Sequence, residues 1–568
     1  MATSKSRMEG MFWHVDYKWI VLSNTTLGVL MATIDGSIVI ISLPAIFNGL
    51  GVNPLLPSNA GLLIWMLLGY LLVTSVLLVT FGRLSDMLGR VKMYNLGFLI
   101  FAVASTLIYI SSLLVSGPNG VLSLILLRVV QGVGSAFLFA NNAAILTDAF
   151  KHDELGKAMG INLVAGVGGS IIGLVVGGIL AAIDWHLVFL VSVPIGILGA
   201  VWSYLALHEV AKIREHQHLD IPGSITLGAG LTAILVGLTL SLLPYGGRPL
   251  GWYSPTVLLS LAAGIALIVS FIFIEHRSKD PLFHLKLFRI RAFSAGNVSQ
   301  FLAGISRGGL QFMLIIWLQG IWLPMHGVSF INTPFWAAIY MLPLVLGFLA
   351  LGPLSGYLSD RYGPRALTTG GMLLNALGFV ILANFPANFS YIPFAVVIFI
   401  MGAGSGMFSA PNTAAIMNSV PPEYRGVASG MRATFLNSSN LFSIGIFFTL
   451  LIAGLSISLP HALLSGLVAS NVPYGIALNI SRIPPVSAVF AALLGYNPIK
   501  SVIPSSVFAT IPKATADKIA SDSFFPRVIS PAFIAGMKLV MYAGAAMSIF
   551  AAAISSLRGR GRYVHVNF

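Results

Sequence analysis

Long apolar stretches follow one another along almost the whole chain, and no other feature constrains its fold as strongly. Each stretch is about 20 residues or longer, the length that a helix needs to cross a hydrocarbon core roughly 30 Å thick. Only 8% of the 568 residues are charged, whereas soluble domains carry about 25%. We therefore expect an all-α integral membrane protein of about fourteen transmembrane helices.

The expected spans form a first set of six, a pair and a second set of six. They lie near residues 19–47, 61–81, 93–115, 119–147, 157–182 and 186–207, then 223–243 and 254–275, then 292–322, 334–358, 366–385, 390–418, 426–456 and 533–556. One connection is unusually long, at 457–532. Long loops cross the membrane largely regardless of their charge, so its basic residues do not contradict an outer position. Whether its apolar part touches the membrane surface stays open.

Lys and Arg are concentrated in alternate connections between these spans. Arg83, Arg90 and Lys92 follow the second span, for example, whereas the connections of the other set are nearly bare. Cytoplasmic loops carry such an excess of basic residues, so we expect a multi-pass protein of the cell membrane with both termini cytoplasmic. The formal net charge of +14 then reflects contact with the lipid bilayer, and no nucleic-acid partner is expected.

A short motif occurs twice, each time after the second span of a six-helix set. Gly82-Arg-Leu-Ser-Asp86-Met-Leu-Gly89 recurs as Gly356-Tyr-Leu-Ser-Asp360-Arg-Tyr-Gly363. The repeat predicts a six-helix N-terminal half (1–210), two inserted helices (211–280) and a six-helix C-terminal half (281–568) that includes the long outer loop. Repeated halves around a central site are typical of transporters that work by alternating access.

The first copy of this motif continues to Gly89-Arg90-x-Lys92 and resembles the signature loop between helices 2 and 3 of the major facilitator superfamily. With the two-helix insertion, the chain resembles the fourteen-span branch of drug:proton antiporters in that superfamily. The resemblance covers almost the whole chain except 457–532. It implies a proton-coupled exporter of small amphipathic compounds, with no enzyme activity.

The repeated motif predicts a gate at the cytoplasmic face. Asp86 is expected near a helix N-terminus, where negative charge is favoured by about 0.3–1 kcal/mol. It can also pair with Arg90 or with a basic residue of the other half, and that contact would break when the gate opens. The expected gate residues are Gly82, Asp86, Gly89, Arg90, Gly356, Asp360 and Gly363. The alternative is an ordinary polar turn.

Two charged residues lie at similar depth inside spans of the N-terminal half. Asp35 occupies the first span, and a carboxylate at mid-membrane costs about 2.5–3.5 kcal/mol on insertion scales. Arg128 lies in the fourth span, in Arg128-Val-Val-Gln131-Gly, which resembles the proton-transfer motif of the family. Both lie roughly 14–18 Å from the outer ends of their helices, so pairing and proton coupling are predicted. The alternatives are a carboxylate lining a wet cavity mouth and an arginine that reaches the outer surface.

The fifth span carries a run of glycines that resembles the antiporter motif of the family. The helix-bending residues implied are Gly169, Gly173, Gly177 and Gly178. A Gly-Pro pair marks exporters in that motif, and Leu174 stands where its proline would be. Close packing through small residues is the alternative role.

Polar residues inside other spans are candidates for a substrate cavity. They are Gln131, Asn141, Asn142, Arg307, Gln311 and Asn412. Arg128 and Arg307 place two cations against one intramembrane acid, so neutral and anionic substrates stay open. The asparagines can instead form hydrogen bonds between helices, which is their commoner role.

Signals for other chemistry are missing from the sequence. The chain has no cysteine, no P-loop and no cluster with metal-ligand spacing, so we expect no enzyme activity, no metal and no cofactor. The expected partners are a small-molecule substrate, protons and lipid, and the expected state is a monomer. An importer or uniporter of one metabolite, and a membrane sensor without transport, remain alternatives.

Overall fold

A computed structural model describes most of the chain. The described residues are 16–53, 55–150, 152–210, 219–278, 280–421, 424–499 and 513–558. Fourteen helices in this part are long and apolar enough to cross a membrane. The described residues form helices and no strand of a sheet, so the expected all-α membrane fold is confirmed.

The N-terminal half contains six spans. They are α2 (Tyr17–Gly49), α3 (Pro57–Leu88), α4 (Arg90–Leu114), α5 (Gly117–Ala149), α6 (His152–Ile183) and the pair formed by η1 (Trp185–Phe189) and α7 (Ser192–Ala206). Within this half, α2 packs against α6, and α5 packs against both α3 and α4. The last helix, α7, lies against α4 and α2.

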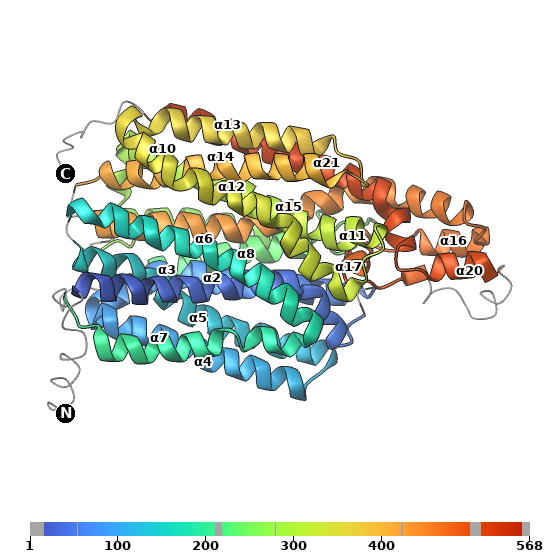
Figure 1. The fold of residues 1–568 in the computed structure, drawn as a ribbon, viewed down its shortest axis with the longest axis horizontal. Coiled ribbons are helices and arrows are strands. Elements are labelled where there is room, and N and C mark those ends of the chain that lie inside the picture. The colour runs from blue at the N-terminus through green and yellow to red at the C-terminus, as the bar shows by residue number, and fades with distance from the viewer. Residues whose placement is uncertain are drawn as a thin grey trace.

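The C-terminal half repeats this arrangement. Its first span joins α10 (Arg291–Trp317), the π-helical turn η3 (Leu318–Trp322) and α11 (Leu323–Met325), and it follows the 3-10 turn η2 (Leu285–Arg289). The others are α12 (Thr333–Tyr362), preceded by η4 (Phe330–Asn332), then α13 (Pro364–Ala383), α14 (Tyr391–Asn418), α15 (Arg425–Val468) and α21 (Phe524–Ser556). The two halves lie side by side (Figure 1), and they meet where α6 packs on α12 and where α3 packs on α15.

The two copies of the glycine motif form matching turns. Gly89 separates α3 from α4 with φ +107°, and Gly363 separates α12 from α13 with φ +82°. These positive φ values favour glycine, since a side chain would crowd the backbone there. Gly82 faces Ala140 and Gly356 faces Ala410 at nearly equal distances. The sequence repeat is therefore also a repeat of helix packing.

Two inserted helices, α8 (Ile221–Leu240) and α9 (Pro255–Arg277), form a hairpin beside the bundle. The Asp220 side chain caps α8 by accepting a hydrogen bond from the Gly223 N–H at 2.8 Å. Helix α8 packs on α3 and α15, whereas α9 packs mainly on α8. Much of the surface of α9 is therefore left for lipid.

The prediction of one long outer loop at 457–532 is wrong at both ends. Helix α15 continues to Val468, and α21 begins at Phe524. Three short helices occupy part of the interval, α16 (Tyr474–Ile480), α17 (Pro485–Leu493) and α20 (Lys513–Ala520). The apolar composition explains the extension, because continuing a helix satisfies the backbone polar groups of residues that the protein buries.

Helix α17 forms one part of the apolar stretch, residues 462–494, whose contact with the membrane surface the sequence left open. Every residue of α17 is buried. It packs against η3, α15 and α3, and it meets α16 at an angle of 91°. The residues of α17 are thus covered by protein from both halves, whereas Val468 and Tyr474 earlier in the stretch are exposed.

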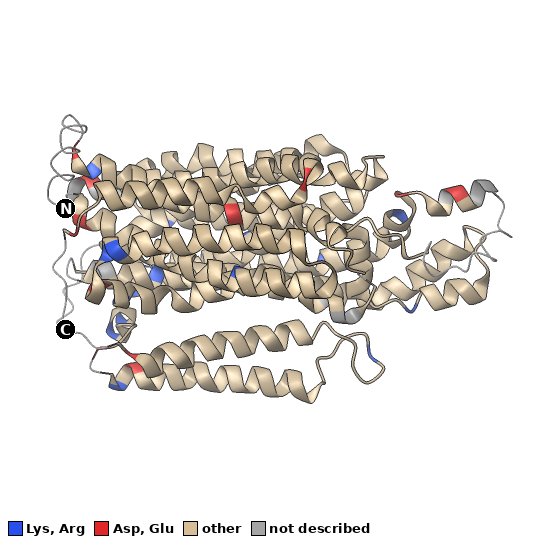
Figure 2. Ribbon diagram, turned by 90° about the horizontal axis from the view of Figure 1, so that it is seen from below, with Lys and Arg blue, Asp and Glu red and all other residues tan. Residues whose placement is uncertain are grey.

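Charged residues distinguish the two ends of the bundle. The first turn of α2 and the last turn of α21 lie at the same end (Figure 1). Most Lys, Arg, Asp and Glu of the helical bundle lie near that end (Figure 2). We call it the basic end, and the opposite end, which carries α16, α17 and α20, the far end.

Candidate functional site

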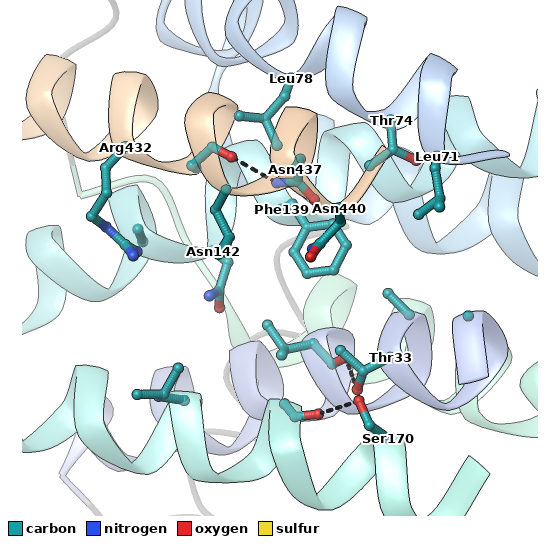
Figure 3. A pocket seen from close by; sticks show the side chains of 18 of the residues that line it. Thr33, Leu71, Thr74, Leu78, Phe139, Asn142, Ser170, Arg432, Asn437 and Asn440 are labelled. Atoms are coloured by element: carbon teal, nitrogen blue, oxygen red, sulfur yellow. Dashed lines mark hydrogen bonds between the residues drawn. The ribbon is translucent and has the colours of Figure 1, made fainter. Parts of the chain in front are cut away.

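A cavity of about 770 Å³ lies between the two halves. Its wall begins near the middle of the bundle, at residues such as Ser37 and Gln311, and continues to Asp86 and Arg90 at the basic end. Residues of α2, α3, α4, α5, α6, α10, α12, α14 and α15 contribute to it. Figure 3 shows Asn142, Asn440 and Arg432 projecting into this space. The cavity therefore reaches from mid-membrane to the basic end.

The far end is closed by contacts between the halves. The side-chain amide of Gln319 donates to the carbonyl oxygen of Ile41 at 3.2 Å. Asn48 donates in the same way to the carbonyl oxygen of Leu494 at 2.7 Å. A methyl group added at Gly178 would come within 2.6 Å of the Cα atom of Phe335. A solute in the cavity thus has no open route through the far end in this conformation.

Asp35 and Arg128 form a buried ion pair close to the cavity. The Arg128 Nη1 atom lies 3.4 Å from Asp35 Oδ2. Asp35 is fully buried and Arg128 is 2% exposed. Arg128 lines the cavity, whereas Asp35 lies behind the cavity wall. The predicted pairing is present, and it links the middle of α2 to the middle of α5.

Further groups hold the Asp35 carboxylate in place. Oδ1 accepts hydrogen bonds from Gln131 Nε2 at 2.9 Å and from Ser192 Oγ at 3.3 Å. Gln131 also donates to Ser105 Oγ at 2.9 Å. The Tyr70 ring lies 4.8 Å from the Arg128 guanidinium, within the range of a cation–π interaction. A buried carboxylate with one cationic partner is suited to binding and releasing a proton, because protonation changes its electrostatic attraction to Arg128.

Arg90 connects three elements at the basic end. Its Nε donates to Asp86 Oδ1 at 2.7 Å, and its Nη1 donates to Asp148 Oδ1 at 2.7 Å. Asp86 lies in the last turn of α3, just before α4 begins at Arg90, and its expected pairing with Arg90 is present. The carboxylate that caps α4 belongs to Glu209, which accepts from the Val91 N–H at 2.8 Å. The Asp86 pair is therefore internal to the N-terminal half in this conformation.

Arg90→Ala is expected to lower the stability of the protein by about 1.5–3 kcal/mol, because it removes hydrogen bonds between charged groups and leaves two partly buried carboxylates without their shared cation. Thermal unfolding in detergent measures the loss. Arg83→Ala is the matched control, since Arg83 forms one ion pair among the described residues, with Asp280 at 3.3 Å, which predicts a smaller change. Equal stability of Arg90→Ala and the wild type would contradict the role given to this network.

The second copy of the motif lies at the equivalent place in the C-terminal half. Gly356 and Gly363 occupy positions in and after α12 that match those of Gly82 and Gly89 in and after α3. The side chain of Asp360 lies outside the described part of the structure. A gate built from both copies therefore stays a prediction.

The glycines of α6 mostly pack this helix against α2. A methyl group at Gly177 would come within 2.6 Å of the Ile41 side chain, and Gly169 and Gly173 face α2 in the same way. Gly178 instead faces α12 of the other half. Close packing therefore accounts for Gly169, Gly173 and Gly177, and the contact between the halves accounts for Gly178. Bending of α6 at these glycines stays a prediction.

Four of the six predicted cavity residues line the cavity, namely Asn141, Asn142, Arg307 and Gln311. The prediction is wrong for Gln131 and Asn412. Gln131 is fully buried and serves Asp35.

Asn412 is also fully buried, and it ties α14 to its neighbours. Its side-chain amide donates to Gln300 Oε1 at 3.0 Å, and its oxygen accepts from Arg558. Burial lowers the pKa of Arg558 to about 10, so this guanidinium stays charged at neutral pH. The interhelical role therefore applies to Asn412.

Three residues that contribute to these sites were missed in the sequence. Arg432 lines the cavity from the second turn of α15. Its place just inside an apolar span could have marked it as a candidate cavity residue. Asp148 had the same kind of signal at the end of α5. Ser192 had none, because a serine at the start of a helix gives no indication of a carboxylate partner from another helix.

The comparison with protein families is decisive. Residues 25–220 and 221–444, well over half of the chain, match the model of the Major Facilitator Superfamily. The chain belongs to this superfamily. It is a multi-pass membrane transporter, and the resemblance inferred from Gly82 to Lys92 is confirmed.

Curated relatives of the chain include a riboflavin transporter, a resistance and export protein and a multidrug transporter protein. The chain is 29% identical over 482 residues to the riboflavin transporter RibZ of Clostridioides difficile, covering 83% of this chain and 97% of the relative. It is 27% identical over 545 residues to the tetracenomycin C resistance and export protein of Streptomyces glaucescens, covering 94% and 91%. It is 26% identical over 427 residues to the multidrug transporter protein MdtP of Bacillus subtilis, covering 75% and 74%. Names of this kind support the drug:proton antiporter branch of the superfamily.

Solved structures share the fold. A bacterial homologue of the human lysosomal transporter Spinster, in an inward-facing and unoccupied conformation, matches with a TM-score of 0.54 and 17% identity, covering 95% of this chain and 97% of that one. The xylose transporter XylE from E. coli, in a partially occluded inward-open conformation, matches with a TM-score of 0.51 and 14% identity, covering 76% and 91%. At these identities the comparison establishes the architecture alone.

Proposed function

We propose that the protein is a proton-coupled exporter of small amphipathic compounds that works by alternating access. The observation that carries this proposal is the buried Asp35–Arg128 pair beside a cavity between two repeated halves. A carboxylate that is buried at mid-membrane is costly, and such residues commonly belong to proton or substrate pathways. The pair provides a proton site, and the adjoining cavity provides a solute site.

The basic end is proposed to face the cytoplasm, with both termini on that side. Connections at this end carry most of the Lys and Arg residues that flank the spans, which is the pattern of cytoplasmic loops. The cavity would then receive solutes from the cytoplasm in the conformation described above. The far-end contacts would close the path to the outside.

In the proposed transport cycle, one half of the protein rocks against the other. The halves are proposed to be 1–210 and 281–568, with the inserted helices 211–280 carried beside them. Rocking would separate Gln319 from Ile41 at the far end and close the basic end. Asp35 would take a proton from the outside in that state, weaken its attraction to Arg128, and release the proton to the cytoplasm after the halves return.

Relatives support two kinds of cargo. The tetracenomycin C export protein and MdtP are named as exporters or multidrug transporters, which supports export of varied amphipathic compounds. RibZ is named as a riboflavin transporter, which supports transport of one metabolite as the second candidate. Export of several compounds accounts better for a cavity as large as about 770 Å³.

Flux measurements in proteoliposomes test the proposal. The probes are ethidium as a cation, riboflavin as a neutral solute and pyrene-1-butyrate as an anion. Antiport predicts that at least one probe accumulates when the lumen is acidic, because protons leave as the solute enters. Accumulation only when the outside is acidic would indicate symport, and flux that ignores the gradient would indicate a uniporter. Either result would overturn the proposed coupling.

A further inference from the structure

The charges on the cavity wall do not balance. Five arginines and two aspartates line it among the described residues, namely Arg83, Arg90, Arg128, Arg307, Arg432, Asp86 and Asp148. Arg90 is paired with both aspartates. Arg83 has Asp280 and Arg128 has Asp35, two carboxylates outside the lining. Arg307 and Arg432 have no acidic partner within the described part of the chain.

Arg307 occupies the deeper of the two positions. It lies at the middle of the span Arg291–Met325, and it has neither an ion pair nor a side-chain hydrogen bond among the described residues. A guanidinium cannot give up its proton in a protein, so it stays charged at this depth. Cations inside membrane spans are typically paired or belong to a substrate pathway. Because no described residue forms an ion pair with Arg307, the expected partner of this cation is a solute that enters the cavity.

Neutral polar groups surround this position. Gln311 lies one helical turn beyond Arg307 on the same face of α10, and both line the cavity. Asn440 comes from α15, close to Gly308, since a methyl group at Gly308 would lie 3.5 Å from Asn440 Oδ1. Figure 3 shows Asn440 projecting into the cavity. The amide groups of Gln311 and Asn440 can donate hydrogen bonds, as Arg307 can, so the three groups together suit an acceptor-rich anion.

Arg432 extends the positive wall toward the basic end. It lies in the second turn of α15, and its closest polar partner is Thr413, whose Oγ1 atom is 3.5 Å from Nη1. Its Nε atom is buried without a hydrogen-bond partner. An anion that enters from the basic end would therefore meet Arg432 before it reaches Arg307.

We propose that the cavity binds amphipathic organic anions, with the carboxylate, sulfonate or phosphate head held by Arg307, Gln311 and Asn440. This inference rests on the proposed function for the direction of movement, but it concerns the substrate class of the same cavity. Apolar wall residues, including Leu71, Leu78 and Phe139, receive the apolar part of the solute. Arg432 attracts the anion along its path.

Binding of three probes with one ring system tests the proposal. They are pyrene-1-butyrate, pyrene-1-butanol and pyrene-1-butylamine, which are anionic, neutral and cationic. Energy transfer from tryptophan to pyrene reports binding to the purified full chain in detergent, with protein-free micelles subtracted. Because no pH gradient is applied, this measurement is independent of proton coupling. We expect the anion to bind on the order of tenfold more tightly than the alcohol, because one charge-assisted hydrogen bond contributes about that much to affinity. We expect the amine to bind most weakly.

Variants assign the preference to the cavity. Arg307→Gln is expected to weaken binding of the anion about tenfold while leaving the alcohol unchanged, and Arg307→Lys is expected to keep part of the preference. Arg248→Gln is the matched control, because it removes the same charge from the turn between α8 and α9, where Arg248 contacts Tyr253. Equal binding of the three probes by the wild type would overturn the proposal. So would equal weakening of all three probes by Arg307→Gln, which would make Arg307 a structural residue.

The flux experiment then separates this inference from the proposed function. Proton-driven accumulation of ethidium but not of pyrene-1-butyrate would support antiport and overturn the anion site. Tight binding of pyrene-1-butyrate without any gradient-driven flux would support the anion site and overturn proton coupling.

Discussion

Asp35→Asn is expected to reduce transport driven by a pH gradient to the level of protein-free liposomes. Asparagine cannot take up and release a proton, so a cycle coupled through this side chain stops. Exchange of labelled for unlabelled solute without a gradient is expected to continue, because the cavity wall at Arg128 remains. Parallel measurements of gradient-driven uptake and of exchange in the same proteoliposomes check this expectation.

The fold must tolerate the change for this result to be informative. Asp35→Asn leaves Arg128 buried without an anion, which costs about 3–5 kcal/mol for a buried pair. The double variant Asp35→Asn with Arg128→Gln removes both charges and is the stability control. It is expected to unfold at a higher temperature than the single variant and still to lack coupling. Gradient-driven uptake by a folded Asp35→Asn variant at the wild-type rate would refute the assignment of Asp35.

Gly178→Val is expected to open the far end. A methyl group at Gly178 would come within 2.6 Å of Phe335 Cα and 2.9 Å of Phe335 N, so α6 and α12 cannot keep their present separation. Overpacking of this kind costs about 1–3 kcal/mol. Only the conformation that is closed at the far end bears this cost, so the population should shift toward the opposite conformation by roughly tenfold, which corresponds to about 1.4 kcal/mol.

Cysteine labelling measures this shift directly, because the chain has no cysteine of its own. Gln319→Cys places a thiol in the buried contact with Ile41 at the far end, and Ser429→Cys places one on the cavity wall near the basic end. With Gly178→Val, a soluble maleimide is expected to label position 319 faster and position 429 more slowly. Gly160→Val in the same helix is the control, because a methyl group there meets nothing within 4 Å. Identical labelling with both valine variants would show that the α6–α12 contact does not set the conformation.

Much of the architecture is encoded locally and was therefore predictable from sequence. Apolar length determines which segments can span a bilayer, and the positions of Lys and Arg divide the connections into two sets. The pairing of Asp35 with Arg128 could also be predicted from the sequence. Two opposite charges at similar depths in neighbouring apolar helices have few other partners, and burial makes an unpaired charge costly.

The direction in which each polar side chain faces was decided by the tertiary structure. Gln131 and Gln311 look alike in sequence, yet one serves Asp35 and the other lines the cavity. Asn142 on α5 and Asn412 on α14 both lie in the fourth span of their half, yet only Asn142 lines the cavity. Transmembrane helices are apolar on most faces, so hydropathy does not report how a helix is rotated about its axis. Contacts with neighbouring helices set that rotation.

The membrane class, the number of spans, the repeat and the pairing of Asp35 with Arg128 follow from the amino-acid sequence. The positions of Arg307 and Arg432 on the cavity wall, without acidic partners among the described residues, and the burial of α17 between the halves emerge from the folded arrangement. The two groups of features differ because they depend on interactions of different range. Spanning a bilayer depends on about 20 consecutive residues, whereas a cavity and its charge depend on which faces of nine separate helices are turned toward one another.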